Sequence, residues 1–83
     1  MKNNLNYAVI GSGSWATAIV KILSDNLNSI AWYVRNNETL DYIQKNKHNP
    51  NYLSSVELNL SKLQISANLN DVVRNADVII LVV

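Results

Sequence analysis

A glycine-rich run near the amino terminus has residue types and spacing suited to binding phosphate. The apolar residues Tyr-Ala-Val-Ile at positions 7–10 are followed by Gly-Ser-Gly-Ser-Trp-Ala at positions 11–16, a G-x-G-x-x-A pattern. In this pattern Gly11 permits a tight turn, Gly13 lets a pyrophosphate approach the backbone, and Ala16 allows close packing of a helix on a sheet. The pattern predicts a nucleotide-binding turn between a strand and a helix.

Binding at such a turn is mainly by backbone N–H groups, with the positive end of the helix dipole behind them. The Ser14 hydroxyl adds a donor to phosphate, whereas Trp15 either shields the site or packs in the core. The competing interpretation of the whole motif is a tight turn that uses glycine for backbone reasons alone. The correct order of strand, turn, helix and second strand favours nucleotide binding.

The end of the second expected strand bears on which dinucleotide binds. An NAD-selective site usually has an acidic residue there, but this chain has Val-Arg-Asn-Asn at positions 34–37, with Arg35 nineteen residues after Ala16. The Arg35 guanidinium can pair with a 2′-phosphate or stack on adenine, which favours NADP(H) while tolerating NAD(H) and disfavouring FAD. The alternative for Arg35 is a solvated charge. The expected cofactor-binding residues are Gly11, Ser12, Gly13, Ser14, Trp15 and Arg35.

Apolar periodicity predicts the elements that position these residues. They are strands over 7–10, 30–34, 63–67 and 77–83, and helices over 15–23, 38–46 and 70–75. The alternation predicts the α/β class: a Rossmann-type doubly wound parallel sheet, incomplete, with four strands in the order 3-2-1-4 and helices on both faces.

Details of the helices follow from the same patterns. Asn37 is expected to cap the second helix, with Leu40 and Ile43 on its buried side, and Asn68 or Asn70 to cap the third. The stretch 47–59 is expected to be irregular because Pro50 forbids helix there. The buried stripe of the first helix is expected to consist of Trp15, Ala16, Ala18, Ile19, Ile22 and Leu23.

Composition excludes several classes of function. The 83 residues cannot hold a two-domain enzyme, and 48% hydrophobic with 16% charged residues excludes a disordered chain. A net charge of +1 leaves no basic surface for nucleic acid, and the lack of cysteine with a single histidine excludes thiolate and all-histidine metal sites. We expect His48 to be solvated, and no catalytic carboxylate pair among Asp25, Asp41, Asp71 and Asp77.

The chain lacks a signal-peptide pattern and an apolar stretch long enough for membrane insertion, so a cytoplasmic location is expected. The segment 78–83 is apolar enough to be a parallel strand covered on both faces, yet no residues follow to cover it. We therefore expect a piece of a longer protein. The last strand should be an exposed sheet edge that promotes self-association.

Four segments of the chain resemble the family of NAD(P)-dependent glycerol-3-phosphate dehydrogenases. They are the fingerprint at 7–18, Trp-Tyr-Val-Arg at 32–35, Asn-Pro-Asn-Tyr-Leu at 49–53 and the strand at 77–83. The chain departs from the family pattern at Ala16, where glycine is usual, and at Ser54-Ser55, where Pro-Gly is usual. The Gly-Ser-Trp variant and the Asn-Pro-x-Tyr-Leu segment are more specific than the G-x-G-x-x-A pattern.

The resemblance implies that residues matching Ser14, Trp15 and Arg35 contact NADPH. It also implies that 1–83 is the N-terminal part of a dinucleotide-binding domain, with the catalytic lysine and a C-terminal catalytic helical domain absent from this chain. The implied activity is the interconversion of dihydroxyacetone phosphate and sn-glycerol 3-phosphate for phospholipid synthesis. The alternatives are another NADP-dependent dehydrogenase, acting on a small hydroxy acid or sugar acid, and a non-catalytic nucleotide-sensing module.

Overall fold

A computed structural model shows a four-stranded parallel sheet with the strand order β3-β2-β1-β4, as the sequence predicts. It describes residues 5–27, 29–47, 49 and 58–82. The strands are β1 (Tyr7–Ile10), β2 (Ile30–Tyr33), β3 (Leu63–Ser66) and β4 (Val78–Leu81), and the helices are α1 (Ser14–Asn26), α2 (Asn37–Asn46), the 3₁₀ turn η1 (Leu60–Lys62) and α3 (Leu69–Val73).

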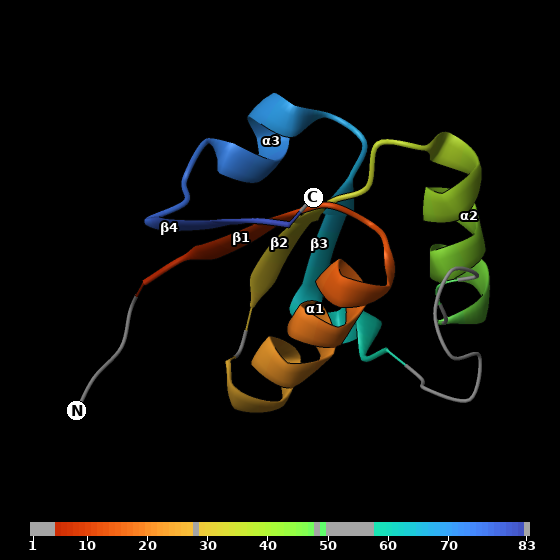
Figure 1. The fold of residues 1–83 in the computed structure, drawn as a ribbon, viewed down its shortest axis with the longest axis horizontal. Helices are drawn as coiled ribbons and strands as arrows, with labels where there is room; N and C mark the ends of the chain where they lie inside the picture. The colour runs from red at the N-terminus through yellow and green to blue at the C-terminus, as the bar shows by residue number, and fades with distance from the viewer. Residues whose placement is uncertain (1–4, 28, 48, 50–57, 83) are drawn as a thin grey trace.

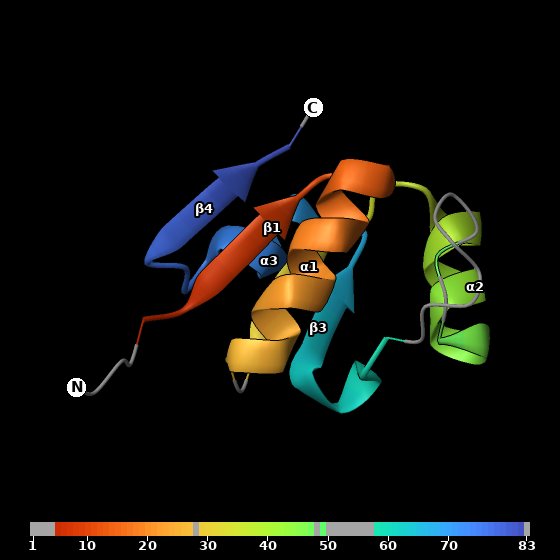
Figure 2. The same ribbon diagram turned by 60° about the horizontal axis from the view of Figure 1, so that its bottom comes forward.

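Helices α1 and α3 lie on opposite faces of the sheet, and α2 lies beyond the β3 edge (Figures 1 and 2). The core fills the α1 face. There the strands are in register so that Val9 pairs with Trp32 and Ile80, and Trp32 pairs with Ile65. Ile43 of α2 joins this cluster and is fully buried, as the sequence predicts. The packed sheet therefore supports the loops at its carboxyl edge.

The buried face of α1 differs from the expected one. The helix buries Ala16, Thr17, Val20 and Ser24, while Trp15 is 78% and Ile22 61% exposed. Spacings of four between positions 16, 20 and 24 define the face toward the sheet, and this rotation turns Trp15 and Ile22 to the outside. The interpretation of Trp15 as a core residue is therefore wrong.

Asparagine side chains cap the amino ends of α2 and α3. The Asn36 Oδ1 atom accepts hydrogen bonds from the Glu38 and Thr39 N–H groups at 2.8 and 3.2 Å, so Asn36 caps α2 and the prediction of Asn37 is wrong by one residue. Asn68, one of the two expected residues, caps α3. The 3₁₀ turn η1 was not expected, and Pro50, Tyr52, Leu53, Ser54 and Ser55 lie outside the described residues.

Strand β4 forms one edge of the sheet, as expected, and pairs with β1. Its Ile79 and Leu81 side chains are 52% and 68% exposed. The start of the strand is tied to the start of β1, because the Asn6 N–H donates to Asp77 Oδ2 at 2.8 Å and the Asp77 N–H donates to the Asn6 carbonyl at 2.7 Å. Within the described ranges, no helix has the length and apolar character to cross a membrane.

Candidate functional site

The turn between β1 and α1 requires glycine at position 11. Gly11 has φ of 135°, a backbone conformation that L side chains rarely adopt, and a Cβ atom there would overlap the Val82 carbonyl oxygen. The close approach is part of the sheet, since the Val82 N–H donates to the Ile10 carbonyl at 2.9 Å. Gly11 thus serves the tight turn that the motif predicts.

Gly13 is different, because packing does not demand it. It stands at the amino end of α1 in extended backbone, with φ of −79°, which any residue can adopt. Apart from its two chain neighbours, no residue of the described part of the chain has an atom within 4 Å of a Cβ built on it. The glycine keeps open a space beside the first turn of α1, where a helix most readily accepts an anion.

Three successive carbonyl groups of the turn accept hydrogen bonds from side chains elsewhere in the fold. Trp32 Nε1 donates to the Gly11 carbonyl at 2.6 Å, and Asn49 Nδ2 donates to the Ser12 carbonyl at 2.8 Å. Thr17 Oγ1 donates to the Gly13 carbonyl at 2.9 Å and accepts from Asn49 Nδ2.

Sequence reasoning missed these three side chains as parts of the site. Available signals were the position of Thr17, four residues after Gly13, and the place of Asn49 in the Asn-Pro segment. Trp32 gave a weaker signal, because an aromatic residue in an apolar strand is usually explained by packing alone.

A hollow at the carboxyl ends of the strands brings the turn and the end of β2 together. Its volume is about 220 Å³, and it is lined by Ile10, Gly11, Ser12, Tyr33, Arg35 and Val82. The sheet order places β2 and β4 on opposite sides of β1, so this hollow lies at the point where the order of strands reverses. Ligands of open α/β sheets bind at such points.

Of the sequence-predicted site residues, Gly11, Ser12 and Arg35 line this one hollow. The next residues in the chain, Gly13, Ser14 and Trp15, do not line the hollow but lie exposed at the amino end of α1. Arg35 is exposed just beyond the end of β2.

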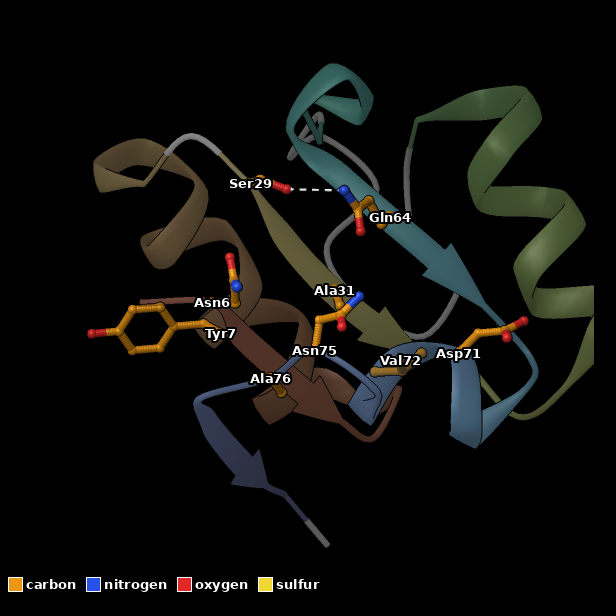
Figure 3. Close-up of a pocket in the computed structure, with 9 residues that line it drawn as sticks. All are labelled: Asn6, Tyr7, Ser29, Ala31, Gln64, Asp71, Val72, Asn75 and Ala76. Carbon is orange, nitrogen blue, oxygen red and sulfur yellow. Dashed lines mark hydrogen bonds between the residues drawn. The ribbon is translucent and has the colours of Figure 1, made fainter. Parts of the chain in front are cut away.

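A larger hollow of about 400 Å³ lies on the α3 side of the sheet (Figure 3). Its lining includes Asn6, Ser29 and Ala76, which lie shortly before the first residues of β1, β2 and β4. Between two of its lining residues, Gln64 Nε2 donates to Ser29 Oγ at 3.2 Å. Because open parallel sheets bind ligands at the carboxyl ends of their strands, we assign the candidate site to the smaller hollow.

Among the residues that the structure describes, no cluster of side chains at this site is suited to chemistry other than binding. Within the described ranges, no three His, Cys, Asp or Glu side chains lie close enough to hold a metal ion. His48 lies outside the described residues. The carboxyl edge of the sheet has a glycine-rich backbone turn at the amino end of a helix, with Arg35 beside it, a geometry suited to an anion.

Comparison with known proteins agrees with this geometry. Residues 6–83 match the family model described as NAD-dependent glycerol-3-phosphate dehydrogenase N-terminus. A glycerol-3-phosphate dehydrogenase [NAD(P)+] of Exiguobacterium is 37% identical over 78 residues, and one of Streptococcus agalactiae is 34% identical over 76 residues. These alignments cover 94% and 92% of this chain, but only 23% and 22% of those two proteins.

A solved structure has the same fold. The crystal structure of glycerol-3-phosphate dehydrogenase from Coxiella burnetii superimposes with a TM-score of 0.84 at 23% identity, over 95% of this chain and 24% of that one. The chain therefore spans about a quarter of the length of the proteins that it matches.

Proposed function

Because this chain belongs to the family of NAD-dependent glycerol-3-phosphate dehydrogenase amino-terminal domains, we propose that it binds the adenosine and pyrophosphate half of NADP(H). Residues 1–83 would then be the N-terminal part of a dinucleotide-binding domain. The observation that carries the proposal is the open space at Gly13, which the fold itself does not require. A pyrophosphate beside the first turn of α1 fits that space.

Each proposed site residue has a distinct role. Gly11 turns the chain so that Ser12 lies in the hollow, and Gly13 admits the pyrophosphate to the backbone. The Ser14 hydroxyl is a further donor to phosphate. Trp15 is 78% exposed, which is compatible with the shielding role that the sequence left open beside core packing, and it would cover the bound cofactor.

Arg35 would select NADP(H). It lines the same hollow as Gly11 and Ser12, which supports a place for it beside the adenosine ribose of a bound dinucleotide. A guanidinium pairs with the 2′-phosphate through charge-assisted hydrogen bonds. NAD(H), which lacks that phosphate, would bind more weakly but at the same site.

For the intact natural protein we propose the reduction of dihydroxyacetone phosphate to sn-glycerol 3-phosphate, a precursor of phospholipids. The nicotinamide supplies the hydride, and the residues described here hold the other half of the cofactor. The catalytic groups would come from the remainder of the cofactor domain and from a C-terminal helical domain, both outside residues 1–83, as the resemblance implies. Support comes from the relatives' names and from the match over nearly the whole chain.

Two finer proposals accompany this function. The first is a cytoplasmic location, which accords with the proposed small phosphorylated substrate and soluble cofactor. The exposed Ile79 and Leu81 side chains on the β4 edge would let residues 1–83 pair with another copy.

The test is oxidation of NADPH by the intact natural protein, followed by absorbance at 340 nm. Turnover with dihydroxyacetone phosphate, and not with small keto acids or with the keto forms of sugar acids, is expected. Turnover with a keto acid instead would favour the hydroxy-acid dehydrogenase alternative. Tight NADPH binding without turnover on any of these substrates would favour a sensing module.

A further inference from the structure

The side chains that hold the glycine-rich turn are buried, and two of them, Trp32 and Asn49, are remote from it in sequence. Trp32 and Thr17 have no exposed surface, and Asn49 is 1% exposed. Trp32 lies in β2 and Asn49 lies beyond the end of α2. They converge on the carbonyl groups of Gly11, Ser12 and Gly13.

These bonds fix the direction of the amide groups as well as the carbonyls. In a trans peptide the C=O and the following N–H point in opposite directions from one rigid plane. A carbonyl held by the protein interior therefore directs the N–H of the next residue away from that bond. Holding the Gly11, Ser12 and Gly13 carbonyls in this way orients the N–H groups of the three residues that follow, 12–14.

We propose that Trp32, Asn49 and Thr17 are positioning residues, which orient the backbone N–H groups of residues 12–14 toward the pyrophosphate of the bound dinucleotide. This inference rests on the proposed function, and it adds three residues that do not themselves touch the cofactor. A flexible turn would have to be ordered when the cofactor binds, whereas a turn held beforehand avoids that cost.

Thr17 and Asn49 form a connected pair. Asn49 Nδ2 donates both to the Ser12 carbonyl and to Thr17 Oγ1, and Thr17 Oγ1 donates to the Gly13 carbonyl. Removing the Thr17 hydroxyl therefore takes from the Gly13 carbonyl one of its two hydrogen bonds, since the Thr17 N–H also donates to it at 3.0 Å. It also deprives Asn49 of one of its acceptors. A buried polar group is costly when it is unpaired, so arrangements of the turn that break the hydrogen bonds of Asn49 and Thr17 are disfavoured.

The chain offers a matched control in the same helix. Ser24 of α1 is also buried, at 2% exposure, and its Oγ donates to the Lys21 carbonyl at 2.9 Å. This bond resembles that of Thr17 in chemistry but lies near the carboxyl end of α1. Its loss should change stability without changing the turn.

The experiment measures the dissociation constants of NADPH and of adenosine 2′-phosphate, which lacks the pyrophosphate, by calorimetric titration of the intact natural protein. The variants are Thr17→Val, which keeps the shape but removes the hydroxyl, Thr17→Ser, which restores it, and Ser24→Ala. We expect Thr17→Val to weaken NADPH about tenfold and adenosine 2′-phosphate less than about twofold. Thr17→Ser and Ser24→Ala should bind both ligands nearly as the unaltered protein does.

Asn49→Ala provides a second, independent variant with the same expected pattern. Equal weakening of both ligands in Thr17→Val and Asn49→Ala, whether or not the variants remain folded, would overturn the proposal. Unchanged NADPH affinity in both would do so as well. Failure of the proposed function is distinguishable, because then the unaltered protein itself would bind no NADPH, and the positioning role would fall with it.

Discussion

Alanine at position 11 and alanine at position 13 are expected to damage the protein in different ways. The two glycines belong to one turn, yet only Gly11 has a positive φ and a close backbone neighbour. Gly11→Ala should therefore act on folding and Gly13→Ala on cofactor binding. Each variant is the control for the other, since both add one methyl group to the same turn.

For Gly13→Ala the expected change in the free energy of unfolding is near zero. Alanine is a poorer residue than glycine at the amino end of a helix, which costs about 0.5–1 kcal/mol. The replacement also restricts the unfolded chain, which stabilises the protein by about 0.4–1 kcal/mol. Because the added Cβ meets no atom of the described residues within 4 Å, no steric term is added. The net change is within about 0.5 kcal/mol.

For Gly11→Ala the expected loss is at least about 3 kcal/mol. A non-glycine residue in this region of φ and ψ costs about 1–3 kcal/mol. The overlap of the new methyl with the Val82 carbonyl adds to this, because the end of β4 must move away from β1. Against a typical stability of about 5–15 kcal/mol, the loss is large.

Chemical denaturation, followed by circular dichroism, gives the free energy of unfolding, and calorimetric titration gives NADPH affinity. Gly13→Ala should unfold like the unaltered protein and bind NADPH at least about tenfold more weakly, since its methyl occupies the space assigned to the pyrophosphate. Unchanged NADPH affinity in Gly13→Ala, or a stability loss as large as that of Gly11→Ala, would refute the reasoning.

Three further predictions concern single side chains. Arg35→Asp should shift the ratio of NADH to NADPH affinity at least about tenfold toward NADH, by removing a charge-assisted pair with the 2′-phosphate; an unchanged ratio of dissociation constants would exclude Arg35 from the site. Asn36→Ala should lower the free energy of unfolding by about 1 kcal/mol, and Asn37→Ala by much less, because only the former loses the α2 cap; equal denaturation midpoints would contradict the cap assignment. Leu81→Lys should reduce self-association of residues 1–83 in sedimentation experiments, since Leu81 is 68% exposed on the β4 edge; an unchanged average mass would exclude that edge as the contact.

The sheet and its order were predictable because the signals are local. Short apolar runs such as positions 7–10 end at turn residues, and the fingerprint fixes how the first strand meets the first helix. The hollow that unites Gly11, Ser12 and Arg35 follows from the same topology, since parallel strands bring their carboxyl ends to one edge.

Details that depend on rotation or on distant contacts were not predictable. Several apolar residues of α1 fit a helical period, and only packing against the sheet decides that Val20 is buried and Ile22 exposed. The sequence offers two adjacent asparagines as caps for α2. Because the helix begins at Asn37, the residue before it, Asn36, is the cap. Asn49 reaches the Ser12 carbonyl across 37 positions of sequence, and no local pattern predicts such a bond.

The most direct test of the central claim is a two-dimensional NMR titration of the ¹⁵N-labelled intact natural protein with NADPH. The amide signals of Ser12, Gly13 and Ser14 are expected to shift in proportion to occupancy, because their N–H groups would face the pyrophosphate. The signals of Asn75 and Ala76, which line the larger hollow on the α3 side, should stay in place. Shifts at Asn75 and Ala76 with none at the glycine-rich turn would contradict the proposed site.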